Sequence, residues 1–232
     1  MSGEPVSQVV SIPVGGGRQV SAELTVPANP RAVVLFAHGS GSSRRSPRNK
    51  HIAKRLEEAG LATVLVDLLA PGEDRPGAGE VWLRSDVPYL AERLITVLRW
   101  VERHSQLGRL PIGLFGSHTG AAAALMAAAL RPEGIAAVVC RGGRPELAGE
   151  ALTDVLAPTL FVVGENDAPI VQQNREAQPR LSCPTRLEIV PGASHLFDEP
   201  GALDRVAELA RVWFARNLAG EAQESAPTQP GA

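Results

Sequence analysis

Residues 112–120 read Ile-Gly-Leu-Phe-Gly-Ser-His-Thr-Gly and lead into the small-residue segment Ala121–Leu130. Glycines stand at Gly116 and Gly120, two positions before and two positions after His118. This is the spacing of a sharp strand-to-helix turn, in which a side chain at either glycine would clash with neighbouring backbone. The stretch therefore predicts a turn that holds its central residue, His118, above the end of a strand.

Short apolar runs on both sides of this turn indicate the rest of the sheet. The runs are Ala32–Ala37, Ala62–Val66, Ile112–Phe115, Ile135–Val139, Thr159–Val163 and Arg186–Val190. Continuous apolar runs of this length are typical of strands that are covered on both faces, as in a parallel sheet. Before them, Val6–Ile12 and Gln19–Val26 alternate apolar and polar residues around Gly15-Gly16-Gly17, which predicts an antiparallel hairpin.

Amphipathic segments lie between the predicted strands. In Asp86–His104 and in Ala202–Leu218 the apolar residues recur at helical spacing and form one stripe, which we expect to face the core. A hairpin followed by alternating strands and helices predicts an α/β fold with a mostly parallel sheet and helices on both faces. In such a sheet the functional residues lie at the carboxyl ends of the strands.

Length and composition are those of one folded unit. The 232 residues, of which 44% are hydrophobic, are enough to bury a sizeable core. No internal repeat and no linker divides the chain, so we expect a single domain over residues 1–220. Residues 221–232 are mostly polar or small and include two prolines, which predicts a disordered tail.

Charge and hydropathy exclude several classes of partner. The 23 basic and 25 acidic residues nearly balance, so the chain offers no basic face for nucleic acid. The sequence shows neither a secretory signal nor an apolar stretch as long as a membrane span, which predicts a cytoplasmic protein with no membrane partner. Cys140 and Cys183 have no metal-ligand spacing, and we expect both to be buried, reduced thiols.

Residues suited to catalysis follow three of the predicted strands. The first loop, His38–Ser43, contains glycines and follows the predicted strand Ala32–Ala37. Its backbone N–H groups can approach a substrate oxygen closely. Gly164-Glu165-Asn166-Asp167 and Pro191-Gly192-Ala193-Ser194-His195 follow the last two strands. A turn, then an acid, then a histidine is the chain order of the α/β-hydrolase catalytic triad.

From Val9 to Leu218 the sequence resembles the dienelactone-hydrolase-related group of α/β-hydrolases. Four stretches carry the resemblance: His38–Ser43, Ser46–Asn49, Arg141–Pro145 and Pro191–Phe197. The resemblance implies an α/β-hydrolase fold. It also implies hydrolysis of a small carboxylic ester or lactone by a nucleophile, an Asp and a His, without a cofactor or a metal.

The position of each residue in this pattern suggests its role. We expect His195 to be the general base, oriented by Asp167, with Glu165 as the competing acid. Backbone N–H groups of Ser40 and Thr119 are expected to form the oxyanion hole, because its donors come from the first loop and from the residue after the centre of the turn.

His118 departs from the family pattern, in which Ser or Cys normally stands at the centre of the turn. Taking Ser117 as the centre would put Phe115 and Thr119 where the glycines belong, although a one-residue shift of register stays open. The central residue usually has a positive φ, which His tolerates. A neutral imidazole attacks an ester without prior deprotonation, but its ring also takes the space that the scissile carbonyl needs.

Three interpretations of the site follow. The first is a carboxylic ester hydrolase, an esterase or lactonase of weak activity, with His118 as nucleophile. The second is a catalytically impaired hydrolase-fold protein that binds small ligands without turnover. The third, which we disfavour, makes His118, His195 and Asp167 ligands of Zn²⁺ or Fe²⁺, although an Asp that orients a histidine must turn to reach a metal.

Four other polar residues follow strands near the predicted site. Arg141 and Arg144 are equally suited to binding a substrate carboxylate and to pairing with the chain's own acids. His38 is expected to form hydrogen bonds around the oxyanion loop, and Asp67 to cap a loop.

Overall fold

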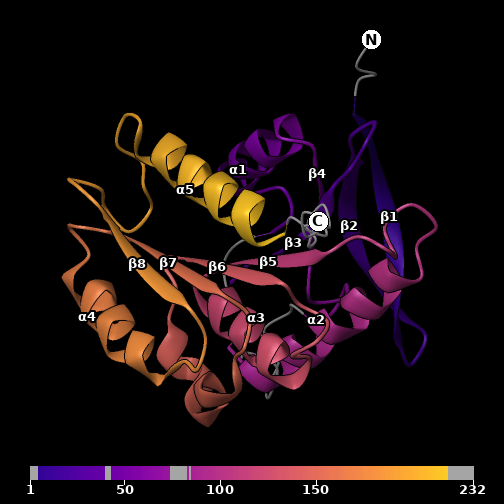
Figure 1. The fold of residues 1–232 in the computed structure, drawn as a ribbon. Coiled ribbons are helices and arrows are strands. Elements are labelled where there is room, and N and C mark those ends of the chain that lie inside the picture. Colours follow the sequence, from indigo (N-terminus) through magenta and orange to yellow (C-terminus); the bar gives the residue numbers. More distant parts are fainter. Residues whose placement is uncertain (1–4, 40–42, 74–82, 84, 219–232) are drawn as a thin grey trace, which may run out of the picture.

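The computed structural model describes residues 5–39, 43–73, 83 and 85–218 of the chain. Within them, strands form a single sheet in the order β1-β2-β4-β3-β5-β6-β7-β8 (Figure 1). The strands are β1 (Val6–Gly15), β2 (Arg18–Val26), β3 (Ala32–Ala37), β4 (Leu61–Val66), β5 (Ile112–Ser117), β6 (Ala137–Arg141), β7 (Thr159–Gly164) and β8 (Thr185–Val190). β1 pairs with β2, and β2 with β4, in antiparallel fashion, whereas every pair from β4 to β8 is parallel.

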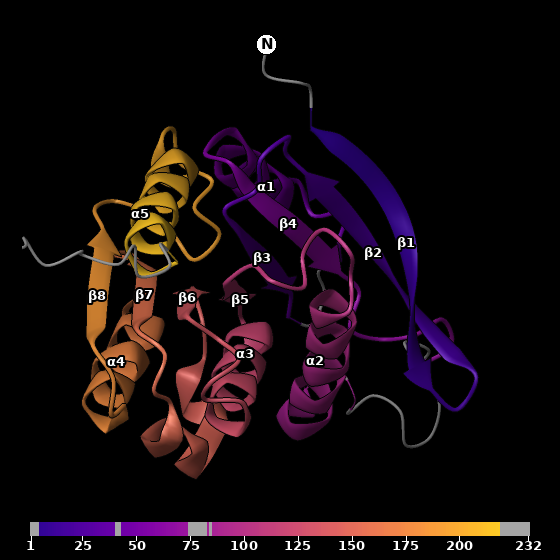
Figure 2. The ribbon, with the colours of Figure 1, turned by 45° about the vertical axis from the view of Figure 1, so that its right-hand side comes forward.

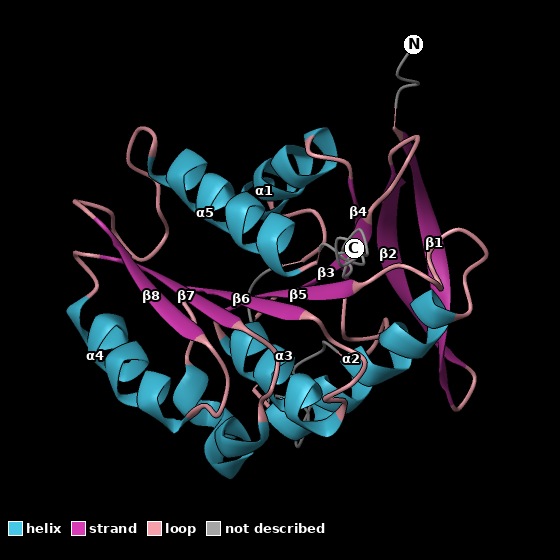
Figure 3. Ribbon diagram, viewed as in Figure 1, coloured by secondary structure: helices cyan, strands magenta, loops and turns pink. Residues whose placement is uncertain are grey.

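Helices cover both faces of this sheet (Figure 3). They are α1 (Pro47–Glu58), α2 (Val87–Glu102), α3 (Thr119–Leu130), α4 (Ala168–Ala177) and α5 (Ala202–Asn217), with short 3₁₀ segments η1 (Pro145–Asp154) and η2 (Gln178–Arg180). α1 and α5 lie on one face, and α2, α3 and α4 lie on the other. The β1–β2 hairpin forms one edge of the molecule (Figure 2). The predicted α/β fold is therefore confirmed.

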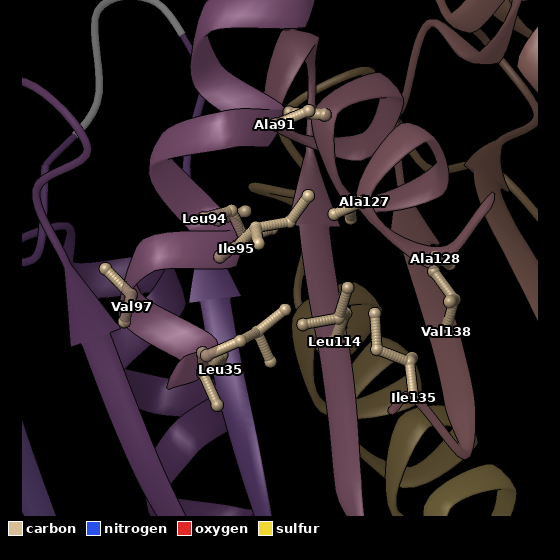
Figure 4. Packing of buried hydrophobic residues seen from close by; sticks show 14 of the residues in the cluster. Leu35, Ala91, Leu94, Ile95, Val97, Leu114, Ala127, Ala128, Ile135 and Val138 are labelled. Atoms are coloured by element: carbon tan, nitrogen blue, oxygen red, sulfur yellow. The ribbon is translucent and has the colours of Figure 1, made fainter. Parts of the chain in front are cut away.

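Two apolar layers join the helices to the sheet. Side chains alternate between the faces of a strand, so successive strand residues enter different layers. Leu35 of β3, Leu114 of β5 and Val138 of β6 pack against α2 and α3, where Leu94 and Ala127 meet them (Figure 4). α3 contributes mostly alanine to this layer, which lets its backbone lie close to the sheet.

The strand order has its switch point between β3 and β5. After β3 the chain forms β4 on one side of it and later returns to form β5 on the other side. Loops that leave the carboxyl ends of two such strands diverge, and the crevice between them is the usual ligand site of an open α/β sheet.

The turn from β5 to α3 lies at this switch point, and its glycines are required by sterics. A Cβ added at Gly116 would lie 2.5 Å from the Cα of Ala121, and one added at Gly120 would lie 2.2 Å from the carbonyl oxygen of Ala37. His118 between them has a φ of 52° and precedes the first residue of α3. The structure thus places His118, as predicted, at the centre of the turn.

Some element boundaries differ from those predicted. β5 continues to Ser117, because Gly116 and Ser117 keep the parallel ladder with β6. β6 begins at Ala137 and ends at Arg141, whereas the predicted apolar run was Ile135–Val139, so Cys140 is the last residue but one of this strand. α2 ends at Glu102 and not at His104, since the N–H of His104 bonds to the carbonyl of Val101 in a tight turn.

Other predictions concern the thiols, the tail and the membrane. Cys140 is buried, but Cys183 is only half-buried, and both are free thiols. The predicted tail, 221–232, lies outside the described residues. None of the helices in the described part of the chain has the length and apolar character that crossing a membrane requires.

We expect Gly120→Ala to destabilise the protein, because the added methyl group meets backbone atoms that cannot move without disturbing β3. The free energy of unfolding should fall by about 2 kcal/mol or more, as in other overpacked sites. Urea unfolding measures it. Gly134→Ala is the matched control, because a Cβ there meets only the flexible Arg131 side chain, at 3.3 Å. Equal stability of the two variants would contradict the steric account.

Candidate active site

Loops at the carboxyl ends of three strands bring three predicted side chains together. His118 follows β5, Asp167 lies between β7 and α4, and His195 lies in the loop after β8. His195 Nδ1 is 2.5 Å from Asp167 Oδ2, and His195 Nε2 is 3.0 Å from His118 Nδ1. The ring centroids of the two histidines are 4.6 Å apart. The three groups therefore form one hydrogen-bonded chain.

The chain of contacts assigns a tautomer to each neutral ring. A carboxylate can only accept, so Asp167 accepts the Nδ1–H of His195. The Nε2 of His195 then has a lone pair, and it accepts the Nδ1–H of His118. His118 in turn keeps its own lone pair on Nε2, the ring nitrogen that does not face His195.

The surroundings of His118 favour its neutral form. Burial is the largest of the causes that together lower the pKa of His118 to about 4. The charges of Arg141 and Arg48, and of His195 when it is protonated, act in the same direction, and Asp167 opposes them. An ordinary histidine is partly protonated at pH 6.5. The His118 ring is accordingly neutral at neutral pH and its Nε2 lone pair is available.

Backbone contacts hold the turn in place. The carbonyl oxygen of His118 accepts the N–H groups of Ala121, at 3.2 Å, and Arg144, at 3.3 Å. A Cβ on Gly39 would lie 2.6 Å from the Cβ of His118 and 2.9 Å from the backbone nitrogen of Thr119. The first loop thus packs directly on the turn, and only glycine fits there.

One of the two predicted oxyanion donors, Thr119, lies among the described residues. Thr119 is the first residue of α3, and its backbone nitrogen borders Gly39 of the first loop. Ser40 lies outside the described residues. The oxyanion hole is therefore a proposal, to which the described residues contribute the position of Thr119.

Asp67 anchors the first loop to β4. Its carboxylate accepts the backbone N–H of Arg44 at 2.8 Å and the Arg44 Nη1 at 2.5 Å, and it lies 3.3 Å from the Nε2 of His38. Burial alone would raise the pKa of Asp67, but the hydrogen bonds from His38 and Arg44 outweigh it and lower that pKa to about 2. Asp67 caps the loop, as predicted. Arg44 was not predicted to take part, since nothing in the sequence pairs residues 44 and 67.

Among the described residues, Glu165 and Ser117, the alternatives at two positions, form no hydrogen bond with His195. Glu165 accepts the backbone N–H of Gly192 at 2.7 Å and so holds the turn that precedes His195. Ser117 is the last residue of β5 and is buried, and its Oγ has no hydrogen-bond partner among the described residues. Asp167 is therefore the acid that contacts His195, and His118 is the residue of the turn that contacts His195.

The arrangement does not favour the metal interpretation. Asp167 and His118 contact opposite nitrogens of the His195 ring, so the three groups lie in a line and do not converge on one point. In the described ranges, no group of three or more His, Cys, Asp or Glu side chains has an arrangement that could hold a metal ion.

Most of the chain matches a known protein family. The model of the Dienelactone hydrolase family matches residues 20–217. The structure of a dienelactone hydrolase from Anabaena variabilis is 47% identical, covers 93% of this chain and all of its own, and superposes with a TM-score of 0.89. Est1E of Butyrivibrio proteoclasticus, at 16% identity, has a TM-score of 0.76 over 91% of this chain and 99% of its own, a likeness of fold alone.

Curated relatives are longer. Proteins from two strains of Mycobacterium tuberculosis are 49% identical over 213 residues, or 92% of this chain, and bear the provisional name phosphoribosyl transferase. The matching segment is 46% of their length. The chain therefore spans about half the length of the curated relatives it matches.

The lowered pKa of His118 predicts a dependence of stability on pH. Between pH 6.5 and 4 the unfolded chain binds a proton at residue 118 that the folded chain does not, so stability is lost as the pH falls through this window. Unfolding by urea at pH 7 and pH 5 should show a loss for the wild type that is about 1 kcal/mol larger than for His118→Ser, after allowance for the partial exposure of the ring.

His104→Ser removes a half-buried imidazole outside the site and controls for the loss of a histidine as such. Identical losses of stability in the wild type and in His118→Ser would show that His118 titrates normally in the folded protein.

Proposed function

Because the chain belongs to the dienelactone hydrolase family, we propose that it hydrolyses small carboxylic esters or lactones with His118 as the nucleophile. The observation that carries the proposal is the hydrogen-bonded chain from Asp167 through His195 to His118. In this chain a neutral His118 has its proton on Nδ1, and its Nε2 has a free lone pair. The family match supports a hydrolase. The choice of substrate bond and of nucleophile is our proposal.

In the acylation step, His118 Nε2 attacks the carbonyl carbon of the ester. The electron pair of the C=O bond moves to oxygen, where the backbone N–H of Thr119 and a donor from the first loop are proposed to stabilise it. As the C–O bond to the alcohol breaks, the Nδ1 proton of His118 passes to His195 Nε2. Asp167 stabilises the resulting imidazolium, whose proton then leaves with the alcohol.

Deacylation uses the same groups in the opposite sense. His195 Nε2, neutral again, takes a proton from water, and the hydroxide adds to the carbonyl of the acyl-imidazole. The C–N bond to His118 breaks, and the proton on His195 returns to His118 Nδ1. Water has been added across the ester bond, and the three side chains are in their starting forms.

We propose hydrolysis and not phosphoribosyl transfer for this chain. The transferase name belongs to relatives of about twice this length. The segment that they share with the chain carries the match to the hydrolase family, over residues 20–217. The site geometry described above also belongs to this segment.

A second candidate, a binding protein without turnover, is favoured by one feature of the same contact. His118 Nδ1 occupies the hydrogen-bonding position of His195 Nε2 that a serine hydroxyl or an attacking water would otherwise take. If the imidazole blocks the base in this way, ligands bind and raise the melting temperature but no product forms. Turnover of a panel of small esters and lactones separates the two functions.

The first prediction of the proposed mechanism is a covalent intermediate. During hydrolysis of 4-nitrophenyl esters, acid quench and peptide mass spectrometry should find the acyl group on His118. His195→Ala should slow turnover by about 10²–10⁴-fold, because it removes the proton acceptor. His104→Ala, which changes a half-buried histidine outside the site, is the control. An acyl group on Ser117 instead would overturn the assignment of the nucleophile.

Substitution at residue 118 tests whether the rest of the site is intact. His118→Ser places a hydroxyl near His195 Nε2, and activity on aryl esters should rise by about 10²–10⁴-fold, the usual contribution of a general base. His118→Ala should lower activity if the imidazole attacks, and should leave it unchanged or higher if the imidazole obstructs. Absence of any gain in His118→Ser, together with no loss in His195→Ala, would contradict the triad and favour the binding protein.

A further inference from the structure

Two glycines that follow β6, Gly142 and Gly143, border both histidines of the candidate active site. A Cβ added to Gly143 would lie 2.5 Å from the Cβ of Ala121, in the first turn of α3. A Cβ added to Gly142 would lie 3.6 Å from the Cε1 atom of His195. The glycine pair, as we call Gly142 and Gly143, therefore packs on the helix that follows His118 and on the His195 ring.

Backbone hydrogen bonds hold the glycine pair at both ends. The N–H of Gly142 donates to the carbonyl of Val162, in β7, at 2.8 Å. The N–H of Arg144, the residue after the pair, donates to the carbonyl of His118 at 3.3 Å. The glycine pair thus connects the central sheet to the turn, and a shift of the pair would move His118.

The loop of His195 is held separately, by the residues that follow β7. Glu165 accepts the backbone N–H of Gly192 at 2.7 Å, and the backbone N–H of Asn166 donates to the carbonyl of Ala193 at 2.9 Å. These bonds do not involve the glycine pair. A shift of the pair would therefore change the position of the His118 ring relative to that of His195.

A third bond to the glycine pair comes from Asn174, a fully buried side chain of α4. Its Nδ2 donates to the carbonyl of Gly143 at 3.0 Å and to the carbonyl of Ile170 at 2.8 Å. Carbonyl oxygens can only accept, so the nitrogen of the amide, and not its oxygen, faces them. Asn174 follows Asp167, the residue before α4, by about two helical turns. One helix thus begins at the acid of the site and binds the glycine pair.

Packing alone does not explain an asparagine at this position. The Oδ1 of Asn174 is buried and has no hydrogen-bond partner among the described residues, which costs free energy. An apolar side chain would avoid that cost. The carbonyl of Ile170 is also the acceptor of the ordinary helical bond from the Asn174 N–H. The contact that requires the amide is therefore the one with Gly143.

We propose that Asn174 is a positioning residue, which holds the glycine pair so that the His118 turn meets His195 at hydrogen-bonding distance. Without Nδ2 the buried carbonyl of Gly143 loses its side-chain donor, and the two histidine rings no longer meet at the observed 3.0 Å. The effect on the contact between the rings is independent of the reaction. The effect on turnover rests on the proposed function, in which His118 passes its Nδ1 proton to His195.

Two substitutions remove the contact with Gly143 in different ways. Asn174→Leu keeps a side chain of similar length and has no donor. Asn174→Ser has a hydroxyl that can still donate to the carbonyl of Ile170, as serines in helices do, but does not reach Gly143. Asn217→Leu is the matched control. Asn217 Nδ2 also donates to the carbonyl one turn back, that of Trp213, at 2.9 Å, but it belongs to α5, on the other face of the sheet.

The first test measures the tautomer of His118 without substrate. Long-range ¹H–¹⁵N NMR at pH 7 should show the proton of His118 on Nδ1 in the wild type and in Asn217→Leu. Both Asn174 variants should show a mixture of the two tautomers, because the contact that selects one of them is lost. A merely structural role would lower the melting temperature and leave the histidine signals of the folded protein unchanged.

Unchanged His118 signals in either folded Asn174 variant overturn the proposal. So does the same change in Asn217→Leu, or a wild-type His118 without its proton on Nδ1. Should Asn174→Leu fail to fold, Asn174→Ser decides.

The second test uses turnover. With 4-nitrophenyl butyrate, kcat should fall about 10- to 100-fold in Asn174→Leu with little change in KM, because a misplaced group slows the chemical step more than binding. Asn217→Leu should keep the kcat of the wild type. An unchanged kcat in Asn174→Leu contradicts the positioning role. If the wild type does not hydrolyse the ester, the proposed function fails, while the NMR experiment still decides whether Asn174 positions His118.

Discussion

The turn between β5 and α3 has room for no side chain at Gly116 or Gly120, because backbone atoms of α3 and of β3 occupy the space. The residue between the glycines has a positive φ and lies at the carboxyl end of β5, at the switch point between β3 and β5. The other loops of the site are built against this turn. Gly39 packs on His118, and the backbone N–H of Arg144 bonds to the His118 carbonyl. The position of residue 118 is therefore a property of the fold, whatever its side chain.

The electrostatics of the site then decide what an imidazole does there. Burial and the charges of Arg141 and Arg48 favour the neutral form of His118. His195 Nε2 accepts the Nδ1–H of His118, so the free lone pair of the His118 ring is on its Nε2. Asp167 accepts the Nδ1–H of His195, which leaves the lone pair of a neutral His195 on Nε2, where it can accept from His118. Arg141 belongs to the same balance, since its charge opposes protonation of His118.

Much of this architecture could be predicted from the sequence, because it depends on local patterns. Apolar runs and amphipathic stripes indicated the strands and helices, and the glycine spacing indicated the turn at His118. Boundaries were less accurate: β5 and β6 both end later than their apolar runs, since the ladder between Ser117 and Arg141 continues with polar residues. Contacts between distant residues had no local signal. Neither the pairing of Arg44 with Asp67 nor that of Arg144 with Glu146 follows from spacing.

The tautomer of His118 tests the central claim most directly, since attack by Nε2 requires a lone pair on that atom. Long-range ¹H–¹⁵N NMR of the imidazoles, assigned with His118→Ser and His195→Ala, distinguishes a protonated from an unprotonated ring nitrogen at pH 7. The account predicts a neutral His118 with its proton on Nδ1 and a bare Nε2, and His195 with its proton on Nδ1. A His118 that carries its proton on Nε2, or that is an imidazolium at pH 7, would contradict it.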